Sequence, residues 1–148
     1  MSYYNEMTLK IKSVSENEAF ARACVASFCL PLNPTLEDIA DIKTAVSEAV
    51  TNCVVHAYPL DSGEIVINVK IIENSVYITV KDFGVGIENV IQAKEPFFTS
   101  KPNNERSGMG FTVMESFMDS VDVTSTLGTG TTVILTKKFQ EVSSAVGG

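Results

Sequence analysis

The sequence predicts an α+β fold, in which a mixed, mostly antiparallel sheet carries helices on one face in a two-layer sandwich. Segments with the two-residue alternation of strands occur near the start, in the middle and near the end of the chain, and helical segments separate these groups. Short polar connections join two pairs of the strand segments, which is typical of antiparallel hairpins.

The first part of the chain is expected to form one strand and two helices. The alternating apolar residues of Met7–Ile11 predict the strand. An S-x-x-E capping box that starts at Ser15 then predicts a helix over residues 16–30. After two prolines, Thr35 is placed to cap a second helix, whose apolar periodicity continues through residues 36–57.

The rest of the chain is expected to form two hairpins on either side of a glycine-rich part. The first hairpin pairs Ile65–Ile72 with Val76–Lys81, and the second pairs Val121–Thr126 with Thr131–Lys138. A short helical pattern covers residues 89–94 between them. The four hairpin strands and the first strand together make up the predicted sheet.

The composition fits one domain with a hydrophobic core. The chain has 148 residues, and 45% of them are hydrophobic. We expect residues 1–140 to form this domain. Residues 141–148 are rich in Ser, Ala and Gly, lack the apolar mass to pack, and are expected to be a disordered tail.

Charge and cysteine content narrow the possible functions. The net charge of −7 and the scattered Lys and Arg residues argue against a direct complex with nucleic acid. A nucleotide stays possible, because helix N-termini and a metal ion can neutralise phosphate locally. Cys24, Cys29 and Cys53 form no C-x-x-C pair and are expected to be small core residues. With no apolar stretch that could cross a bilayer, we expect a reduced, cytoplasmic protein without a membrane contact.

The second predicted helix carries a row of polar residues that could bind a ligand. Glu48, Asn52 and His56 follow one another at intervals of four, which places a carboxylate, an amide and an imidazole on one helical stripe. An apolar stripe faces the other way and is expected to enter the core: Ile39, Ile42, Val46, Ala49, Cys53 and Ala57. The alternative is that the polar row is only the solvent side of an amphipathic helix.

A second candidate site follows the predicted strand that ends at Lys81. Asp82 would lie at the end of this strand, where a pocket can form, and Gly84 and Gly86 would let a planar ligand approach the backbone. An ordinary turn is the alternative. The Asp-Phe-Gly trio does not indicate a eukaryotic-type protein kinase, because the upstream glycine-rich loop and the H-R-D segment are both missing from the chain.

The third candidate site is a glycine-rich segment that opens a helix. Ser107-Gly108-Met109-Gly110 directly precedes a helical pattern that runs through Phe117, so its N–H groups would lie at the positive end of the helix dipole. Phosphate fits such a position. A flexible loop exit is the alternative, and the segment is not a Walker loop, since G-x-x-x-x-G-K-[ST] occurs nowhere.

The aperiodic stretch before this helix has the character of a lid. It contains two hydroxyl residues, Thr99 and Ser107, and two cations, Lys101 and Arg106, which could close over phosphate groups. A dozen residues without period are uncommon in so small a domain unless they have a function. Solvated surface charge is the alternative.

Four motifs, in this order and at these intervals, resemble the nucleotide-binding boxes of the GHKL superfamily of ATPases and kinases: Glu48-x-x-x-Asn52, Asp82-x-Gly84-x-Gly86, Gly108-x-Gly110 and Gly130-Thr131. Within that superfamily, the stretches SEAVTN, PFFTSKP and RSGMGFTVMESFMD resemble the serine-kinase anti-sigma factors of endospore-forming bacteria. The resemblance covers about Asn5 to Lys138. It implies a Bergerat-type ATP-binding sandwich.

The resemblance also implies a ligand set for ATP or ADP. Asn52 would hold Mg²⁺ through its side-chain oxygen, and Asp82 would accept the adenine amino group. Gly86 would permit close approach of the base, and Thr131 would order a water or polar contact beside it. Residues 107–110 would bind phosphate, and residues 99–107 would form the lid.

The implied catalytic residues are Glu48 and Arg106. Glu48 would accept the proton of an attacking serine hydroxyl, and Arg106 would contact the γ-phosphate. If water attacks instead, the same glutamate makes the protein an ATPase. His56 would contact phosphate or merely lie at the helix end, and a nucleotide-dependent binding module without kinase activity is a further alternative.

The implied partners are proteins. Members of the resembled group bind and inhibit a sporulation sigma factor of RNA polymerase and phosphorylate the anti-anti-sigma protein that opposes them. Arg22, expected to be exposed on the first helix, is a candidate partner contact, with a solvated arginine as the alternative. The resemblance implies a homodimer, for which the edge of the first strand, Glu6–Lys12, is a candidate interface.

Overall fold

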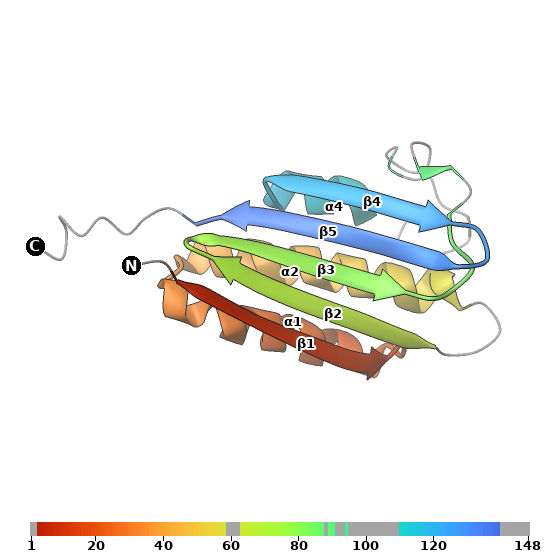
Figure 1. Ribbon diagram of the computed structural model, residues 1–148, viewed down its shortest axis with the longest axis horizontal. Helices are drawn as coiled ribbons and strands as arrows, with labels where there is room; N and C mark the ends of the chain where they lie inside the picture. Colours follow the sequence, from red (N-terminus) through yellow and green to blue (C-terminus); the bar gives the residue numbers. More distant parts are fainter. Residues whose placement is uncertain (1–2, 59–62, 88, 91–93, 95–109, 140–148) are drawn as a thin grey trace, which may run out of the picture.

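The computed structural model describes residues 3–58, 63–87, 89, 90, 94 and 110–139. Five strands form one sheet in the order β1-β2-β3-β5-β4. Their bounds are β1 Tyr4–Lys12, β2 Glu64–Ile72, β3 Ser75–Asp82, β4 Ser120–Thr126 and β5 Gly130–Lys138. Figure 1 shows the sheet as one layer, with the helices behind it. The α+β sandwich expected from the sequence is confirmed.

The sheet is antiparallel throughout, so the expectation of a mixed sheet was wrong. All four strand pairings in the described part of the chain are antiparallel. Two of them are hairpins, β2–β3 and β4–β5, which are antiparallel by construction. Strand β1 is joined to β2 through two antiparallel helices, and this pair returns the chain to the end of the sheet at which β1 finished (Figure 1).

The helices lie on one face of the sheet. In the described part of the chain they are α1 Glu16–Cys29, α2 Leu36–Asn52 and α4 Gly110–Phe117, with a short 3₁₀ turn η1 at Leu30–Leu32 and a π-helical turn η2 at Cys53–Ala57. The second predicted helix is therefore α-helical only to Asn52. None of the described helices is both long and apolar enough to span a bilayer. Most of the short helix expected over residues 89–94, and the tail 141–148, lie outside the described residues.

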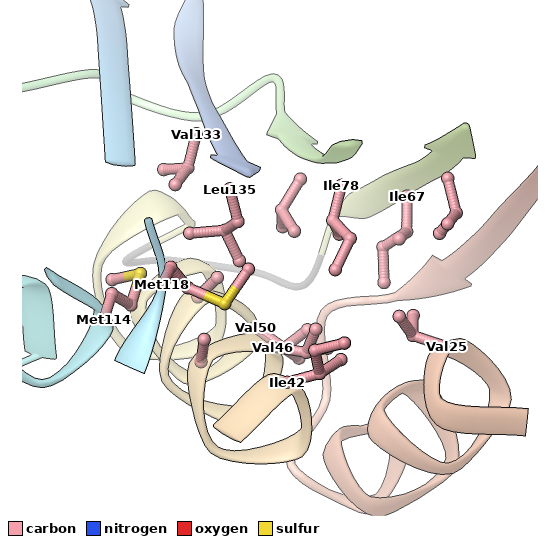
Figure 2. Close-up of a cluster of buried hydrophobic side chains, with 14 of the residues drawn as sticks. Val25, Ile42, Val46, Val50, Ile67, Ile78, Met114, Met118, Val133 and Leu135 are labelled. Atoms are coloured by element: carbon pink, nitrogen blue, oxygen red, sulfur yellow. The ribbon is translucent and has the colours of Figure 1, made fainter. Parts of the chain in front are cut away.

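Strict alternation fixes which face of each strand meets the helices. In β2 every second residue, from Ile65 to Ile71, is fully buried, and the residues between them are more exposed. Figure 2 shows the facing side chains in contact across the two layers: Ile67, Ile78, Val133 and Leu135 from the sheet, and Val25, Ile42, Val46, Val50, Met114 and Met118 from the helical layer. The core is continuous between the layers.

The two expected helix caps differ in outcome. Thr35 caps α2 as predicted, since its Oγ1 accepts the N–H of Asp38 at 3.0 Å. Ser15 precedes α1 but has helical dihedrals and makes no side-chain cap, so the capping box was wrong. Its intended partner Glu18 instead accepts a hydrogen bond from Ser47 of α2 at 2.6 Å and pairs with Arg22. The Glu18 carboxylate that the capping box requires is therefore engaged in a contact between α1 and α2.

One buried cation ties three elements together. Lys137 of β5 is 9% exposed, and its Nζ lies 3.4 Å from Asp41 Oδ2 of α2 and 3.0 Å from the carbonyl oxygen of Phe117. Phe117 is the last residue of α4, where a positive charge is favoured by the helix dipole. The ammonium group thus joins the sheet to α2 and α4.

Removing the anionic partner of Lys137 is expected to destabilise the protein. Asp41→Asn leaves the buried ammonium group without its counter-charge, and we expect the free energy of unfolding to fall by about 1–3 kcal/mol. Urea denaturation followed by circular dichroism measures this loss. Asp122→Asn, at an exposed position of β4, is the matched control and is expected to change stability by less than about 0.5 kcal/mol. Equal stabilities of the two variants would contradict the role of this ion pair.

Candidate functional site

Asp82 lies buried at the end of β3, where the sequence placed it. The residue is 5% exposed, and its Oδ1 accepts the backbone N–H of Gly84 at 3.0 Å and that of Thr131 at 3.1 Å. The second contact crosses to the start of β5, so the residues of two separate motifs meet at one carboxylate. Thr131, which alone carried little signal, is thereby placed beside Asp82.

The second oxygen of Asp82 faces a thiol. Cys53 Sγ lies 3.5 Å from Oδ2, at the beginning of η2, and both residues are buried. Burial, together with the charge of Asp82 and this hydrogen bond, raises the pKa of the Cys53 thiol well above its ordinary value. The apolar spacing predicts only a core position for Cys53. It missed this contact, because a pair 29 positions apart leaves no local pattern.

Two further side chains at this end of the sheet were missed. The Tyr58 hydroxyl accepts the N–H of Phe83 and donates to the carbonyl of Glu64, both at 2.7 Å. Ser125 Oγ accepts the N–H of Ile87 at 2.6 Å and lies 2.8 Å from Thr131 Oγ1. These hydroxyls hold the segment that follows Asp82 from both sides. Tyr58 and Ser125 lie in ordinary turn and strand patterns, and nothing in these patterns predicts their contacts.

The glycines after Asp82 are required by close packing of the backbone itself. A Cβ on Gly84 would lie 2.0 Å from the carbonyl oxygen of Ala57, the last residue of η2. Gly86 has a φ of +79°, and a Cβ there would lie 2.3 Å from the carbonyl oxygen of Thr126. The packing of the backbone therefore requires glycine at both positions. Their contact with a base stays a prediction.

The polar row of α2 meets the glycine that opens α4. A Cβ on Gly110 would lie 3.1 Å from Asn52 Oδ1 and Nδ2 and 3.3 Å from Glu48 Oε2. A side chain on this residue would thus press on both polar groups, so glycine leaves a cradle there. The structure brings together Glu48, Asn52 and Gly110, which sequence analysis had assigned to two different motifs.

The third member of the row, His56, departs from the expected spacing. The helix changes from α to π geometry at Cys53, so the regular interval of four holds for Glu48 and Asn52 and ends before His56. The imidazole is half-buried. Short π-helical segments within helices are frequent at functional sites. Sequence periodicity could not show this change, because apolar residues continue at α-helical intervals to Ala57.

Arg22 is less accessible than expected. Its side chain is 37% exposed and forms an ion pair with Glu18 one turn earlier on α1. Ala21 and Val25, which lie next to Arg22 on α1, are fully buried, so Arg22 borders the buried face of this helix. Arg22 is therefore only partly exposed, and its role as a partner contact stays a prediction. The predicted phosphate and lid residues lie outside the described part of the chain: Thr99, Lys101, Arg106, Ser107, Gly108 and Met109.

The residues present fit a magnesium ion that is held mainly by phosphate. The described part of the chain contains no group of three or more His, Cys, Asp or Glu side chains that could hold a metal by themselves. Mg²⁺ needs no such cage, since it keeps several waters and is usually bound by one or two protein oxygens together with substrate phosphates. The side-chain oxygen of Asn52, beside the Gly110 cradle, is an oxygen of this kind.

Comparison with protein families defines the class of the chain. Residues 12–137 match the family described as Histidine kinase-like ATPase domain, a range that includes every described residue placed at the site above. Membership of this class implies that the chain binds a nucleotide.

Curated relatives define the family more narrowly. The anti-sigma F factor of Clostridium perfringens strain SM101 is 54% identical over 136 residues, which cover 91% of this chain and 97% of the relative. The anti-sigma F factor of Caldanaerobacter subterraneus subsp. tengcongensis is 56% identical over 137 residues, covering 93% and 96%. The chain therefore belongs to the anti-sigma F factor family of histidine kinase-like ATPase domains.

Solved structures agree on the fold. A crystal structure of the RsbU and RsbW domains of a Mycobacterium tuberculosis protein superposes with a TM-score of 0.65 at 21% identity, covering 91% of this chain and 32% of that one. The histidine kinase domain of a blue-light activated kinase from Erythrobacter litoralis gives a TM-score of 0.55 at 21% identity, covering 82% and 61%. At this identity the likeness supports the shared sandwich alone.

Proposed function

We propose that this protein is an ATP-dependent protein serine kinase that binds a sigma F-like factor of RNA polymerase and phosphorylates the anti-anti-sigma protein that opposes it. One observation carries the enzymatic part: Glu48 and Asn52 of α2 lie together against Gly110, the glycine that opens α4. A carboxylate, an amide oxygen and a helix N-terminus at one place suit a phosphoryl group, its metal and its acceptor.

Asp82 is proposed to bind the base of the nucleotide. Its buried carboxylate is fixed by backbone donors at Oδ1. An ionised carboxylate can accept hydrogen bonds but cannot donate them, so it favours a ligand that offers an N–H group. The amino group of adenine meets this requirement. Thr131 lies beside this carboxylate, with its hydroxyl 2.8 Å from Ser125 Oγ, and is proposed to order a water or polar contact to the base.

Asn52 is proposed to hold Mg²⁺ through its side-chain oxygen, and the ion, when bound, neutralises the charge of the phosphates. Residues 107–110 are proposed to donate N–H groups to the phosphates beneath a lid of residues 99–107. Arg106 in that lid is proposed to contact the γ-phosphate.

Glu48 is proposed to act as the general base. It lies one helical turn before Asn52, so its carboxylate is positioned to accept the proton of a serine hydroxyl as the γ-phosphoryl group moves. The same group could activate water, and a GHKL-type ATPase is the second candidate function. The curated relatives favour the first, since they are named as anti-sigma factors and such proteins act through protein partners.

The sigma-binding surface is proposed to include α1 around Arg22. The ion pair with Glu18 holds the guanidinium in place, and Glu18 also accepts a hydrogen bond from Ser47, the residue before Glu48. A partner that engages Arg22 would therefore act on the helix that carries the proposed base. With such partners, we expect the protein to act in the cytoplasm, without direct contact to nucleic acid or membrane.

A homodimer is proposed to form through the outer edge of β1. This strand is at the end of the sheet order and pairs only with β2 among the described strands. Sedimentation equilibrium at micromolar concentration is expected to give twice the chain mass of 16.0 kDa. A mass of one chain at that concentration would contradict the dimer.

Transfer of label from ATP tests the kinase. The protein is incubated with γ-labelled ATP and a lysate of the same cell, and the labelled products are separated and hydrolysed. One small protein that carries phosphoserine is the expected result. Release of free phosphate without a labelled protein would favour the ATPase.

A further inference from the structure

We propose that Cys53 is a positioning residue for base recognition: its thiol holds the Asp82 carboxylate so that Oδ2 is presented to the exocyclic amino group of a 6-aminopurine. The inference rests on the proposed function, in which Asp82 binds the base. It concerns a side chain whose apolar spacing indicated nothing but packing.

The two oxygens of Asp82 are held from two layers of the fold. Oδ1 accepts N–H groups from Gly84 and Thr131, at 3.0 and 3.1 Å, and these donors lie just after the end of β3 and at the start of β5. The Cys53 thiol approaches Oδ2 from the helical layer at 3.5 Å, within the range of hydrogen bonds to sulfur. Donors at one oxygen alone leave a carboxylate able to tilt about that atom. The thiol supplies the second point that fixes its plane.

This arrangement leaves one acceptor position at Oδ2. Each carboxylate oxygen accepts about two hydrogen bonds. The two backbone donors occupy Oδ1, and the thiol takes one position on Oδ2. The remaining position suits one N–H donor, as in a 6-aminopurine, and opposes the carbonyl of a 6-oxopurine, because two acceptors would then meet in a buried site. Cys53 therefore acts on selectivity through Asp82.

Calorimetric titration of the full chain with two nucleotides tests the inference. One is Mg-ATP, and the other is purine riboside triphosphate, which lacks only the 6-amino group. We expect the wild type to prefer ATP. Cys53→Ala is expected to reduce that preference roughly 2- to 10-fold, by weakening ATP and leaving the analogue unchanged, since one hydrogen-bond donor is lost. Cys53→Ser keeps a donor and is expected to retain most of the preference.

A matched control separates this role from packing. Cys29 is a fully buried thiol of α1, and burial raises its pKa to about 12, so Cys29→Ala also removes a buried protonated thiol. Its ATP preference is expected to equal that of the wild type. Circular dichroism confirms that each variant is folded, and Cys53→Ser provides the comparison if Cys53→Ala is not.

The outcomes distinguish the inference from the function beneath it. If Cys53→Ala weakens both nucleotides equally, or leaves the preference unchanged, Cys53 only packs and the inference is overturned. A Cys53→Ser variant that loses the preference while folded would also overturn it. If the wild type itself does not distinguish ATP from the analogue, the role of Asp82 in base recognition fails, and the inference fails with it.

Discussion

Replacing Glu48 with Gln is expected to leave Mg-ATP binding close to that of the wild type and to slow phosphoryl transfer to the partner serine by roughly 10²- to 10⁴-fold. The amide has nearly the shape of the carboxylate, so it preserves the contact with the Gly110 cradle. It cannot take the proton of the attacking hydroxyl. Single-turnover transfer of labelled phosphate, with ATP affinity measured in parallel by calorimetry, separates the two effects.

The control for this variant is Glu37→Gln. Glu37 is an exposed glutamate in the first turn of the same helix, far along α2 from the Gly110 cradle, so the chemical change is the same and the place differs. Its transfer rate is expected to match the wild type. A wild-type rate in Glu48→Gln itself would remove this residue from the mechanism.

The second large effect is expected from Asp82→Asn, which should weaken ATP binding about 10- to 100-fold. The side-chain amide can keep its oxygen toward the backbone N–H groups of Gly84 and Thr131, and its NH₂ group then replaces Oδ2, so two donors would meet where the amino group of the base binds. A base that offers an amino group also loses one of its acceptors. Calorimetric titration with Mg-ATP measures the change.

Asp122→Asn serves again as the control, since it makes the same substitution on an exposed residue of β4. Its ATP affinity is expected to be that of the wild type. An unchanged affinity in Asp82→Asn would refute the placement of the base at this carboxylate. The thermal stability of the variant should be recorded as well, because Asp82 is itself buried.

Much of the fold could be predicted because local patterns specify it. The alternation in β2 and β3 sets their buried face, and the two-residue turn at Glu73 and Asn74 makes their pairing antiparallel. The short turn at Gly128 likewise makes the pairing of β4 with β5 antiparallel. Strand direction for β1 depends instead on how many helices return the chain, which is a property of the whole fold. The expectation of a mixed sheet was wrong for that reason.

Local signals also show their limits at the helix starts. Thr35 and Ser15 carry similar capping motifs, but only Thr35 has the extended backbone that lets its hydroxyl reach the helix. At Ser15 the chain is already helical, and Glu18 contacts Ser47 of the other helix. A motif of four residues contains no information about a distant residue, such as Ser47, that binds the same side chain.

In the candidate site too, local patterns predict some residues and not the contacts between them. Glu48 and Asn52 could be paired by helical spacing, and Asp82 and Gly110 by their places at element ends, so these residues were found from sequence. The meeting of Glu48 and Asn52 with Gly110 depends on the packing of α2 against α4, which the spacing does not encode. The contacts of Cys53, Tyr58 and Ser125 come from distant segments and carry no local pattern. The change to π geometry after Asn52 was invisible for the same reason.

One nucleotide is proposed to span the space from Asp82 to the Glu48–Asn52 pair. The most direct measurement is a crystal structure of the protein with Mg²⁺ and a non-hydrolysable ATP analogue. We expect the adenine amino group within hydrogen-bond distance of Asp82, the metal at the Asn52 side-chain oxygen, and the γ-phosphate next to Glu48. A base bound away from Asp82, or phosphates bound away from Asn52 and Gly110, would contradict this placement of the nucleotide.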